Sequence, residues 1–170
     1  MNIKLLGTSG LIATMTLLAA CATAPEEEVI EVVEETVEPE LTALEIAEME
    51  LENTVGARVY FGYDQYNLTT DAQNILRSQA ALMNRPENMD FRFRIAGNCD
   101  ERGTREYNLA LGERRAEAAK AFLVSLGVDA SRLSTISNGK ETPIDPRSTP
   151  EAWAKNRNAT TTIVVESGLI

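Results

Sequence analysis

Apolar and polar positions along the chain form segments that predict strands and helices in turn. Within residues 91–95, aromatic and aliphatic residues alternate with arginines, which is the period of a strand with one buried face. From Thr104 to about residue 126, apolar residues recur at three- and four-residue steps, as on a helix that buries one side. Gly127 follows this segment as a C-terminal cap. The pattern therefore predicts a strand followed by a long helix.

The remaining segments continue the same alternation. Thr70 and Gln73 fit a capping box that opens a helix over about 71–84, and Pro150 fits the first position of another helix. Further strands are predicted at 57–61, 133–137 and 160–166. The resulting order of strand, helix, strand, helix, strand, helix, strand is typical of an α/β (α+β) domain, in which helices pack on a sheet. We expect one such domain over residues 53–170.

The segment before this domain has a different composition. Residues 22–52 contain twelve Glu and no Lys or Arg, whereas residues 53–170 contain fourteen acidic and fifteen basic residues. The net charge of −10 therefore belongs to the segment, and the domain is nearly neutral. Repulsion between the Glu side chains and the interruptions at Pro25 and Pro39 favour an extended tether. Residues 41–52 are good helix formers, and we expect a short helix there.

The first twenty residues predict a secretion signal. The uncharged run 5–20 follows a single Lys, and it is long enough for a signal core but short for a membrane helix. Ala19 and Ala20 precede Cys21, which resembles the lipobox of bacterial lipoproteins. That resemblance implies a removed signal and several acyl chains on Cys21, since stable anchoring takes at least two chains. Because Ala22 is not Asp, it also implies the outer membrane, with the domain in the periplasm. An ordinary signal with a chance cysteine is the alternative.

The absence of histidine from the chain removes several kinds of site. Ser-His-Asp and Cys-His catalysis and His-ligated metal sites all require that residue. If Cys21 is lipidated, Cys99 has no partner within the chain, and we expect a small buried thiol on a strand. Pairing between two chains is the alternative for Cys99. We therefore predict no catalytic site, metal or cofactor, and a nearly neutral domain disfavours a nucleic-acid partner.

Three stretches of the domain read as motifs. They are VYFGYDQYNL at 59–68, GNCDERGTREYNLALGERRAEA at 97–118, and SNGKETP at 137–143 with KNRNA at 155–159. Together they resemble the OmpA-like peptidoglycan-binding domain over about residues 55–166. The resemblance implies a βαβαβαβ order with helices packed on a four-stranded mixed sheet. It also implies a domain that binds the diaminopimelate of the peptidoglycan stem peptide.

The chemistry of that ligand selects two residues. The diaminopimelate side chain ends in a carbon with both an ammonium and a carboxylate, so its receptor needs an anion and a cation side by side. We expect Asp100, on the turn after a strand, to take the ammonium. We expect Arg115, on the following helix, to fork onto the carboxylate with two parallel hydrogen bonds. An ordinary salt bridge between Asp100 and Arg115 is the alternative.

The resemblance implies further residues around this pair. Tyr63 and Asp64 would form a facing loop, and Asn108 and Leu111 would line the start of the helix. Arg102 and Arg157 would either help to bind carboxylates or hold the loop. We expect Tyr107 to be a core or boundary residue and Trp153 to be a packing residue.

Three functions compete. The resemblance implies a structural linker between outer membrane and peptidoglycan, with TolB and the other Tol proteins of the envelope and cell-division system as partners. The second is an envelope lipoprotein of the same fold outside the Tol system, such as a motility or secretion accessory. The third is a peptidoglycan-cleaving glycosidase, which needs two carboxylates with separated pKa values. Asp100 and Glu101 are adjacent and are followed by Arg102, which suits a salt-bridged ligand site better.

Overall fold

The computed structural model describes residues 41–164 of the 170-residue chain. The predicted signal, Cys21 and most of the predicted tether lie outside the described residues. Among residues 41–164, no helix is both long and apolar enough to cross a membrane.

A four-stranded mixed sheet forms the centre of the domain, as predicted. Its strands are β1 (Arg58–Tyr60), β2 (Arg92–Asn98), β3 (Leu133–Gly139) and β4 (Asn158–Val164), in the spatial order β1-β4-β2-β3. β4 runs antiparallel to both β1 and β2, whereas β2 and β3 are parallel. The α-helices are α1 (Ala43–Glu50), α2 (Thr70–Met83), α3 (Arg105–Ser125) and α4 (Pro150–Asn156). Shorter helical turns are η1 (Leu51–Val55), η2 (Pro86–Asn88) and η3 (Ala130–Arg132).

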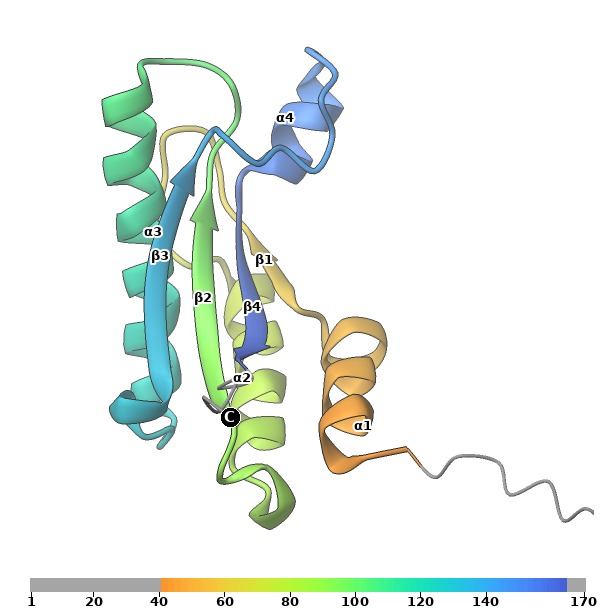
Figure 1. The fold of residues 1–170 in the computed structure, drawn as a ribbon. Helices are drawn as coiled ribbons and strands as arrows, with labels where there is room; N and C mark the ends of the chain where they lie inside the picture. Colours follow the sequence, from red (N-terminus) through yellow and green to blue (C-terminus); the bar gives the residue numbers. More distant parts are fainter. Residues whose placement is uncertain (1–40, 165–170) are drawn as a thin grey trace, which may run out of the picture. The chain divides into compact units, whose positions relative to one another are not determined.

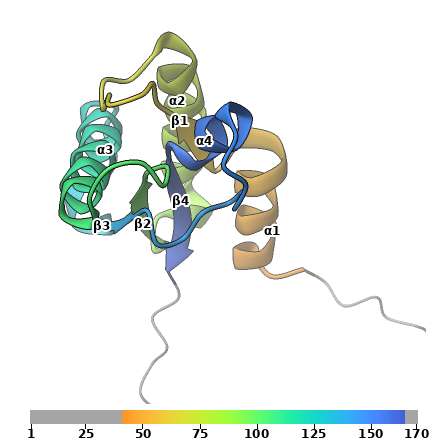
Figure 2. The same cartoon turned by 90° about the horizontal axis from the view of Figure 1, so that it is seen from above.

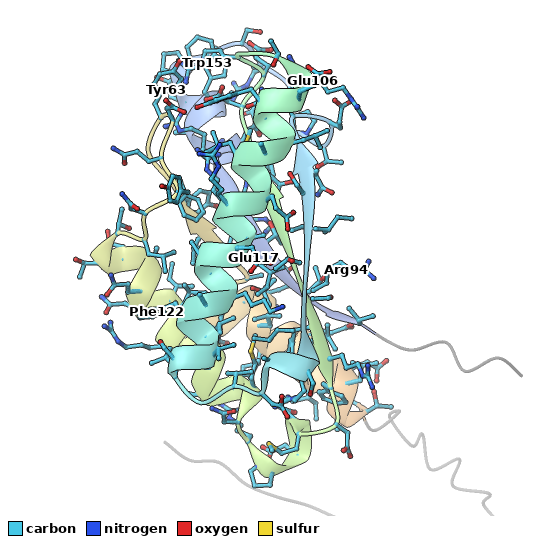
Figure 3. All side chains as sticks on the ribbon, turned by 90° about the vertical axis from the view of Figure 1, so that its left-hand side faces the viewer. Tyr63, Arg94, Glu106, Glu117, Phe122 and Trp153 are labelled. Carbon is cyan, nitrogen blue, oxygen red and sulfur yellow. The ribbon has the colours of Figure 1, made fainter. Side chains whose placement is uncertain are left out.

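One face of the sheet is covered, and the other is open. α2 and α3 pack on the covered face, behind the strands in Figure 1. The core between these layers includes Phe93 and Ile95 of β2 and Leu123 of α3, all 1% exposed or less. Arg94 belongs to the alternate set of β2 side chains and points away from α3 on the open side (Figure 3). The alternation in the sequence therefore correctly identified the buried face of this strand.

The helix ends follow local capping rules. Thr104 accepts a hydrogen bond from the main-chain N–H of Tyr107 at the start of α3, as predicted, and Gly127 has a φ of +89° just after that helix. The predicted cap of α2 was one residue wrong. Thr69, not Thr70, accepts from the N–H of Ala72 at 3.2 Å, so α2 begins at Thr70.

The segment 41–52 forms the predicted short helix and packs on the domain. α1 continues directly into η1, and Leu51 of that turn is 2% exposed among Ala57 and Leu82. Arg85 also donates two hydrogen bonds of 2.6 Å to the carboxylate of Glu50. Figures 1 and 2 place α1 beside the β1 edge of the sheet. Because these residues have partners in the domain, the folded unit begins before residue 53, the predicted boundary.

A backbone contact positions α3 over the end of β2. A Cβ added to Gly97 of β2 would overlap the carbonyl oxygen of Gly112 in α3, and one added to Gly112 would overlap the hydroxyl of Ser137. Only glycine allows a helix to approach a strand this closely. The contact holds the first turns of α3 against the carboxyl end of β2, where the motif residues gather.

Candidate functional site

The motifs meet at the carboxyl end of β2, in a pocket of about 180 Å³. Figure 2 looks onto this end, where the loop after β1, the turn before α3 and the region of α4 come together. All seven predicted ligand residues line the pocket, together with Cys99, Gly103, Tyr107 and Arg157. In Figure 3, the labels of Tyr63, Glu106 and Trp153 mark the same end. The fold therefore brings together segments that are up to about ninety residues apart.

Asp100 lies in the turn directly after β2 and is only 4% exposed. Its Oδ1 accepts from the main-chain N–H and the Nε of Arg102, both at 3.1 Å. Its Oδ2 accepts from an Nη of Arg102 at 2.7 Å and from an Nη of Arg157 at 3.3 Å. Burial by itself would raise the pKa of this carboxyl, but the hydrogen bonds from the two arginines hold the pKa below its ordinary value. Asp100 is therefore a buried, ionised carboxylate.

Arg102 lies between two aromatic rings. Its guanidinium carbon is 4.3 Å from the centre of the Tyr63 ring and 4.2 Å from that of the Trp153 ring. Trp153 is held in place because its Nε1 donates to a carboxylate oxygen of Glu101 at 3.0 Å. Cation–π contacts of this kind stabilise a guanidinium that is partly removed from water. The prediction of Trp153 as a mere packing residue was thus incomplete, since the ring forms one wall of the Arg102 site.

Arg115 is fully buried, and its hydrogen bonds point to main-chain carbonyls. Nε donates to Gln65 at 2.8 Å, while the two Nη atoms donate to Asn98 at 2.7 Å and to Gly62 at 3.1 Å. One Nη also contacts the sulfur of Cys99 at 3.4 Å. Burial lowers the pKa of the guanidinium from its ordinary value, but an arginine stays charged in a protein. Arg115 thus ties the loop after β1 to the end of β2.

These contacts correct two expectations about Asp100 and Arg115. Among residues 41–164, the salt-bridge partners of Asp100 are Arg102 and Arg157, so the alternative of an Asp100–Arg115 salt bridge was wrong. Of the five N–H donors of Arg115, three donate to carbonyls and one contacts the sulfur of Cys99, so the two parallel bonds predicted for it are not both free in this structure. Both residues nevertheless line the pocket, and their contact with a ligand stays a prediction.

The loop after β1 closes one side of the pocket. Asp64 has a φ of +56°, a left-handed conformation that Asp adopts more readily than most residues. Its Oδ1 accepts a hydrogen bond from the hydroxyl of Tyr107, and this bond raises the pKa of the Tyr107 phenol. Tyr63 is 65% exposed at the mouth. The loop is thereby joined to the first turn of α3.

Tyr107 was predicted to be a core or boundary residue, and that prediction was wrong. Its side chain is 45% exposed and lines the pocket, because the first turn of α3 extends past the end of the sheet. A signal was present in the sequence. Tyr107 precedes Leu111 and Arg115 by four and eight residues, a spacing that places all three on one helix face.

Asn108 and Cys99 stabilise the turn that carries Asp100. The amide of Asn108 donates to the carbonyls of Arg102 at 2.8 Å and Thr104 at 3.1 Å, and its side chain is 2% exposed. Cys99 lies one residue beyond β2 rather than on it, and its sulfur contacts the carbonyl of Asn108 at 3.3 Å. Burial raises the pKa of the Cys99 thiol, so the group is neutral and inert. Both residues thus support the turn.

The pocket is suited to hold a small charged group. Leu111, 5% exposed, adds an apolar surface beside the carboxylate of Asp100 and the cations around it. Within the part of the chain that the structure describes, no group of three or more Cys, Asp or Glu residues could hold a metal ion. What the pocket offers is recognition by ion pairs and hydrogen bonds.

The sequence of the pocket and its fold both match known proteins. The OmpA family matches residues 60–157, which contain every side chain of the pocket. This chain belongs to the OmpA family. The match includes the loop after β1, the turn of Asp100, α3 and the residues that follow α4 up to Arg157.

Curated relatives of this OmpA-family chain are similar to it in sequence as well. It is 48% identical over 109 residues to the peptidoglycan-associated lipoprotein of Mesorhizobium japonicum. The aligned region covers 64% of each chain. It is 46% identical over 101 residues to the peptidoglycan-associated lipoprotein of Haemophilus influenzae, covering 59% of this chain and 65% of the relative. This chain thus spans less than two thirds of the length of these curated relatives.

Solved structures support the same family. The crystal structure of the peptidoglycan-associated lipoprotein from Burkholderia pseudomallei matches with a TM-score of 0.64 and 35% identity, covering 69% of this chain and 99% of that one. The C-terminal domain of Helicobacter pylori MotB has the same fold, with a TM-score of 0.59 at 20% identity over 65% of this chain and 85% of that one. The OmpA-family fold is therefore found in proteins of different names.

Proposed function

We propose that this protein binds peptidoglycan without cleaving it and links it to the outer membrane. The observation that carries the proposal is the buried, ionised Asp100 in a small pocket surrounded by arginines. An ammonium group next to a carboxylate is complementary to such a site, and the side chain of diaminopimelate ends in both. The names of the relatives, which are peptidoglycan-associated lipoproteins, support the same ligand.

The expected affinity of one pocket is modest. Hydrogen bonds to charged groups contribute about 1.5–3 kcal/mol each, so two or three of them give a dissociation constant in the range of roughly micromolar to millimolar. Peptidoglycan presents many copies of the same stem peptide, so many such proteins can bind one polymer at the same time. Weak individual sites therefore suit a linker.

The anchor is proposed at Cys21. Several acyl chains on this residue would hold the protein in the outer membrane, with the OmpA-family domain in the periplasm. The acidic segment then separates lipid from domain. Since α1 is part of the folded unit, only residues 22–41 can act as the spacer, with a maximal reach of roughly 70 Å when fully extended.

TolB and the other Tol proteins are the proposed partners in the cell. The fold alone does not select them, because MotB shares it. Crosslinking of the lipidated protein in intact cells, followed by identification of bound proteins, tests this part. We expect TolB among the crosslinked products, and a set without any Tol protein would favour a lipoprotein that acts outside the Tol system.

Peptidoglycan binding is tested by a pull-down. We expect the full-length protein, purified in detergent, to sediment with sacculi that contain diaminopimelate and to be released by a soluble diaminopimelate tripeptide. Lysine-containing sacculi of the same mass provide the control. No sedimentation with either kind of sacculus would contradict the proposal, and release of soluble sugar or peptide fragments would show an enzyme instead.

Binding is expected to be independent of pH between about 5 and 8. The pKa of Asp100 lies below its ordinary value near 3.9, so the carboxylate is present throughout this range and is lost only as the pH falls through the lowered pKa. The raised pKa values of Cys99 and Tyr107 keep both groups neutral there, and the chain has no histidine. Tripeptide titrations by calorimetry at several pH values measure this. A transition with a midpoint between about pH 5 and 7 would contradict it.

A further inference from the structure

Three large apolar side chains at α1 are open to solvent. Leu41, Ile46 and Met49 are 50%, 50% and 48% exposed, and we call them the α1 stripe. Ile46 and Met49 are three residues apart, so they are neighbours on one face of the helix. In Figure 1, α1 lies beside the β1 edge, away from the end of the sheet where α4 lies. The α1 stripe is therefore separate from the pocket of Asp100.

The capping of α1 accounts for only part of this surface. Thr42 is the N-cap, so Leu41 and Ile46 hold the two positions of a hydrophobic staple. A staple fixes the direction in which the chain enters a helix, but half of each side chain stays exposed here. Met49 is not part of the staple and lies almost one turn further along the helix. The apolar surface thus extends along α1 further than capping requires.

The domain packs against a different side of α1. Ala47 of α1 and Leu51 of η1 are each 2% exposed, and Leu51 packs with Ala57 and Leu82. Successive helix residues are about 100° apart, so Met49 lies roughly 200° around the helix from Ala47. Within residues 41–164, the α1 stripe is thus left to solvent while the other side of the helix is buried.

The rim of the α1 stripe is acidic. Glu45, Glu48 and Glu52 are exposed on the adjoining side of the same helical segment. The carboxylate of Glu45 accepts hydrogen bonds from the main-chain N–H and the hydroxyl of Thr42 at 2.8 and 2.9 Å. Glu52 also lies 3.7 Å from Arg58. Residues 22–52 contain twelve Glu and no Lys or Arg, so a partner that covers the α1 stripe must bring positive charge.

This charge selects among three possible occupants of the α1 stripe. A second copy of the chain would bring the same glutamates against Glu45 and Glu48, and like charges across an interface are costly. A lipid surface binds helices that carry Lys or Arg beside their apolar face, whereas anionic headgroups repel Glu. A protein segment with Lys or Arg beside apolar side chains complements both the stripe and its rim.

We propose that the α1 stripe docks a basic amphipathic helix of another protein. Apolar side chains of that helix pack on Ile46 and Met49, and its Lys or Arg side chains pair with Glu45 and Glu48. Three half-exposed side chains make a small contact, so the complex is transient. Because the α1 stripe is separate from the pocket of Asp100, the chain can hold this partner and a pocket ligand at the same time.

Site-specific photocrosslinking in cells tests the docking. A photoreactive phenylalanine analogue replaces Ile46 in the full-length chain, and the crosslinked segment is sequenced by mass spectrometry. We expect a protein segment with apolar residues at three- and four-residue steps and at least two Lys or Arg beside them. The matched control places the analogue at Ile136, which is 44% exposed on β3, at the other edge of the sheet from β1. That position is expected not to give this product.

Two variants of the chain with the analogue at position 46 separate the apolar and charged parts of the contact. Met49→Ser is expected to lower the yield of the product by about fivefold or more, because half a methionine side chain is no longer buried. Glu45→Gln combined with Glu48→Gln is expected to lower it by about threefold or more. Gln at position 45 still fits the capping box, so α1 is retained. Ile136→Ser, the control for Met49→Ser, is expected to keep the yield.

Several results would overturn the docking. They are the absence of a protein product at position 46, a product that is a second copy of this chain or a lipid, and a crosslinked segment without Lys or Arg. An unchanged yield in Met49→Ser would overturn it too. The thermal unfolding midpoint of Met49→Ser is expected to stay within about 3 °C of the wild type, so a lost product reports the contact and not the fold. Peptidoglycan binding is tested separately by the pull-down.

Discussion

Arg115→Met is expected to lower the free energy of unfolding by about 3–5 kcal/mol. The methionine has similar length and fills most of the same space, so the loss comes from hydrogen bonds rather than from a cavity. The carbonyls of Gln65, Asn98 and Gly62 would lose a charged donor in a fully buried position. An unsatisfied buried acceptor costs about 1–3 kcal/mol. The structural role of Arg115 thus predicts a stability defect in the absence of any ligand.

Urea denaturation of the wild type and the variant measures this effect. Arg114→Met is the matched control, since Arg114 is the next residue, is exposed and lies over the ring of Tyr66. The control is expected to change stability by less than about 1 kcal/mol. If Arg115→Met lost no more than Arg114→Met, the joint between the loop and β2 would not depend on the buried guanidinium.

Asp100→Asn is expected to weaken binding of the diaminopimelate tripeptide by about 30- to 100-fold, which corresponds to roughly 2–3 kcal/mol. The substitution keeps the size of the side chain and removes its charge. The new amide N–H₂ would point donors at Arg102 or Arg157, and it could accept from a ligand ammonium only through its single oxygen. Loss of the charge therefore removes the anion of the site without removing the turn that carries it.

Calorimetry with the tripeptide and sedimentation with sacculi both measure this loss. Glu106→Gln is the control, because Glu106 is an exposed carboxylate in the first turn of α3, at the same end of the molecule (Figure 3). It is expected to bind like the wild type. Equal binding by Asp100→Asn and Glu106→Gln would remove Asp100 from the proposed site. If both variants bound more weakly than the wild type by the same factor, the net charge of this end would carry the attraction.

The Asp100→Asn and Arg115→Met variants test two different roles, ligand binding and stability. From the sequence, both residues were expected to bind the ligand. Asp100 and Arg115 were expected to face the ligand together, but the carboxylate of Asp100 pairs with the partly exposed side chain of Arg102 in the pocket. Arg115 has its donors on main-chain carbonyls. We therefore expect Asp100→Asn to change binding much more than stability and Arg115→Met to change stability first.

Local features of the fold were readable from the sequence because they depend on neighbouring residues. The alternation within 91–95 predicted β2 and its buried face, and the spacing after Thr104 predicted α3 with its caps. The capping box at Thr70 missed by one residue, since Thr69 has the same hydroxyl and competes for the same role. Such an error is expected where two adjacent residues can both cap a helix.

The predicted site residues gather in one pocket, but the contacts among them could not be predicted. The motifs placed Asp100 and Arg115 in one pocket, but the partners of Asp100 are Arg102 and Arg157, and the second of these is 57 residues away. The Arg102–Trp153 contact joins the turn before α3 to α4. Neither distance nor orientation between such segments is encoded in a local pattern, because both depend on how the elements pack.

The sequence by itself determined the order of the elements, the buried faces of β2 and α3, the nearly neutral charge of the domain and the residue types of the pocket. These follow from periodicity, capping and composition, which act over a few residues or over the whole chain. Only the tertiary structure decided which arginine neutralises Asp100, that Arg115 is a brace, and that Tyr63 and Trp153 enclose Arg102. The physical reason is that an ion pair or a ring contact depends on distances of a few ångströms between segments, and only the packing of α3 and α4 around the end of β2 sets those distances.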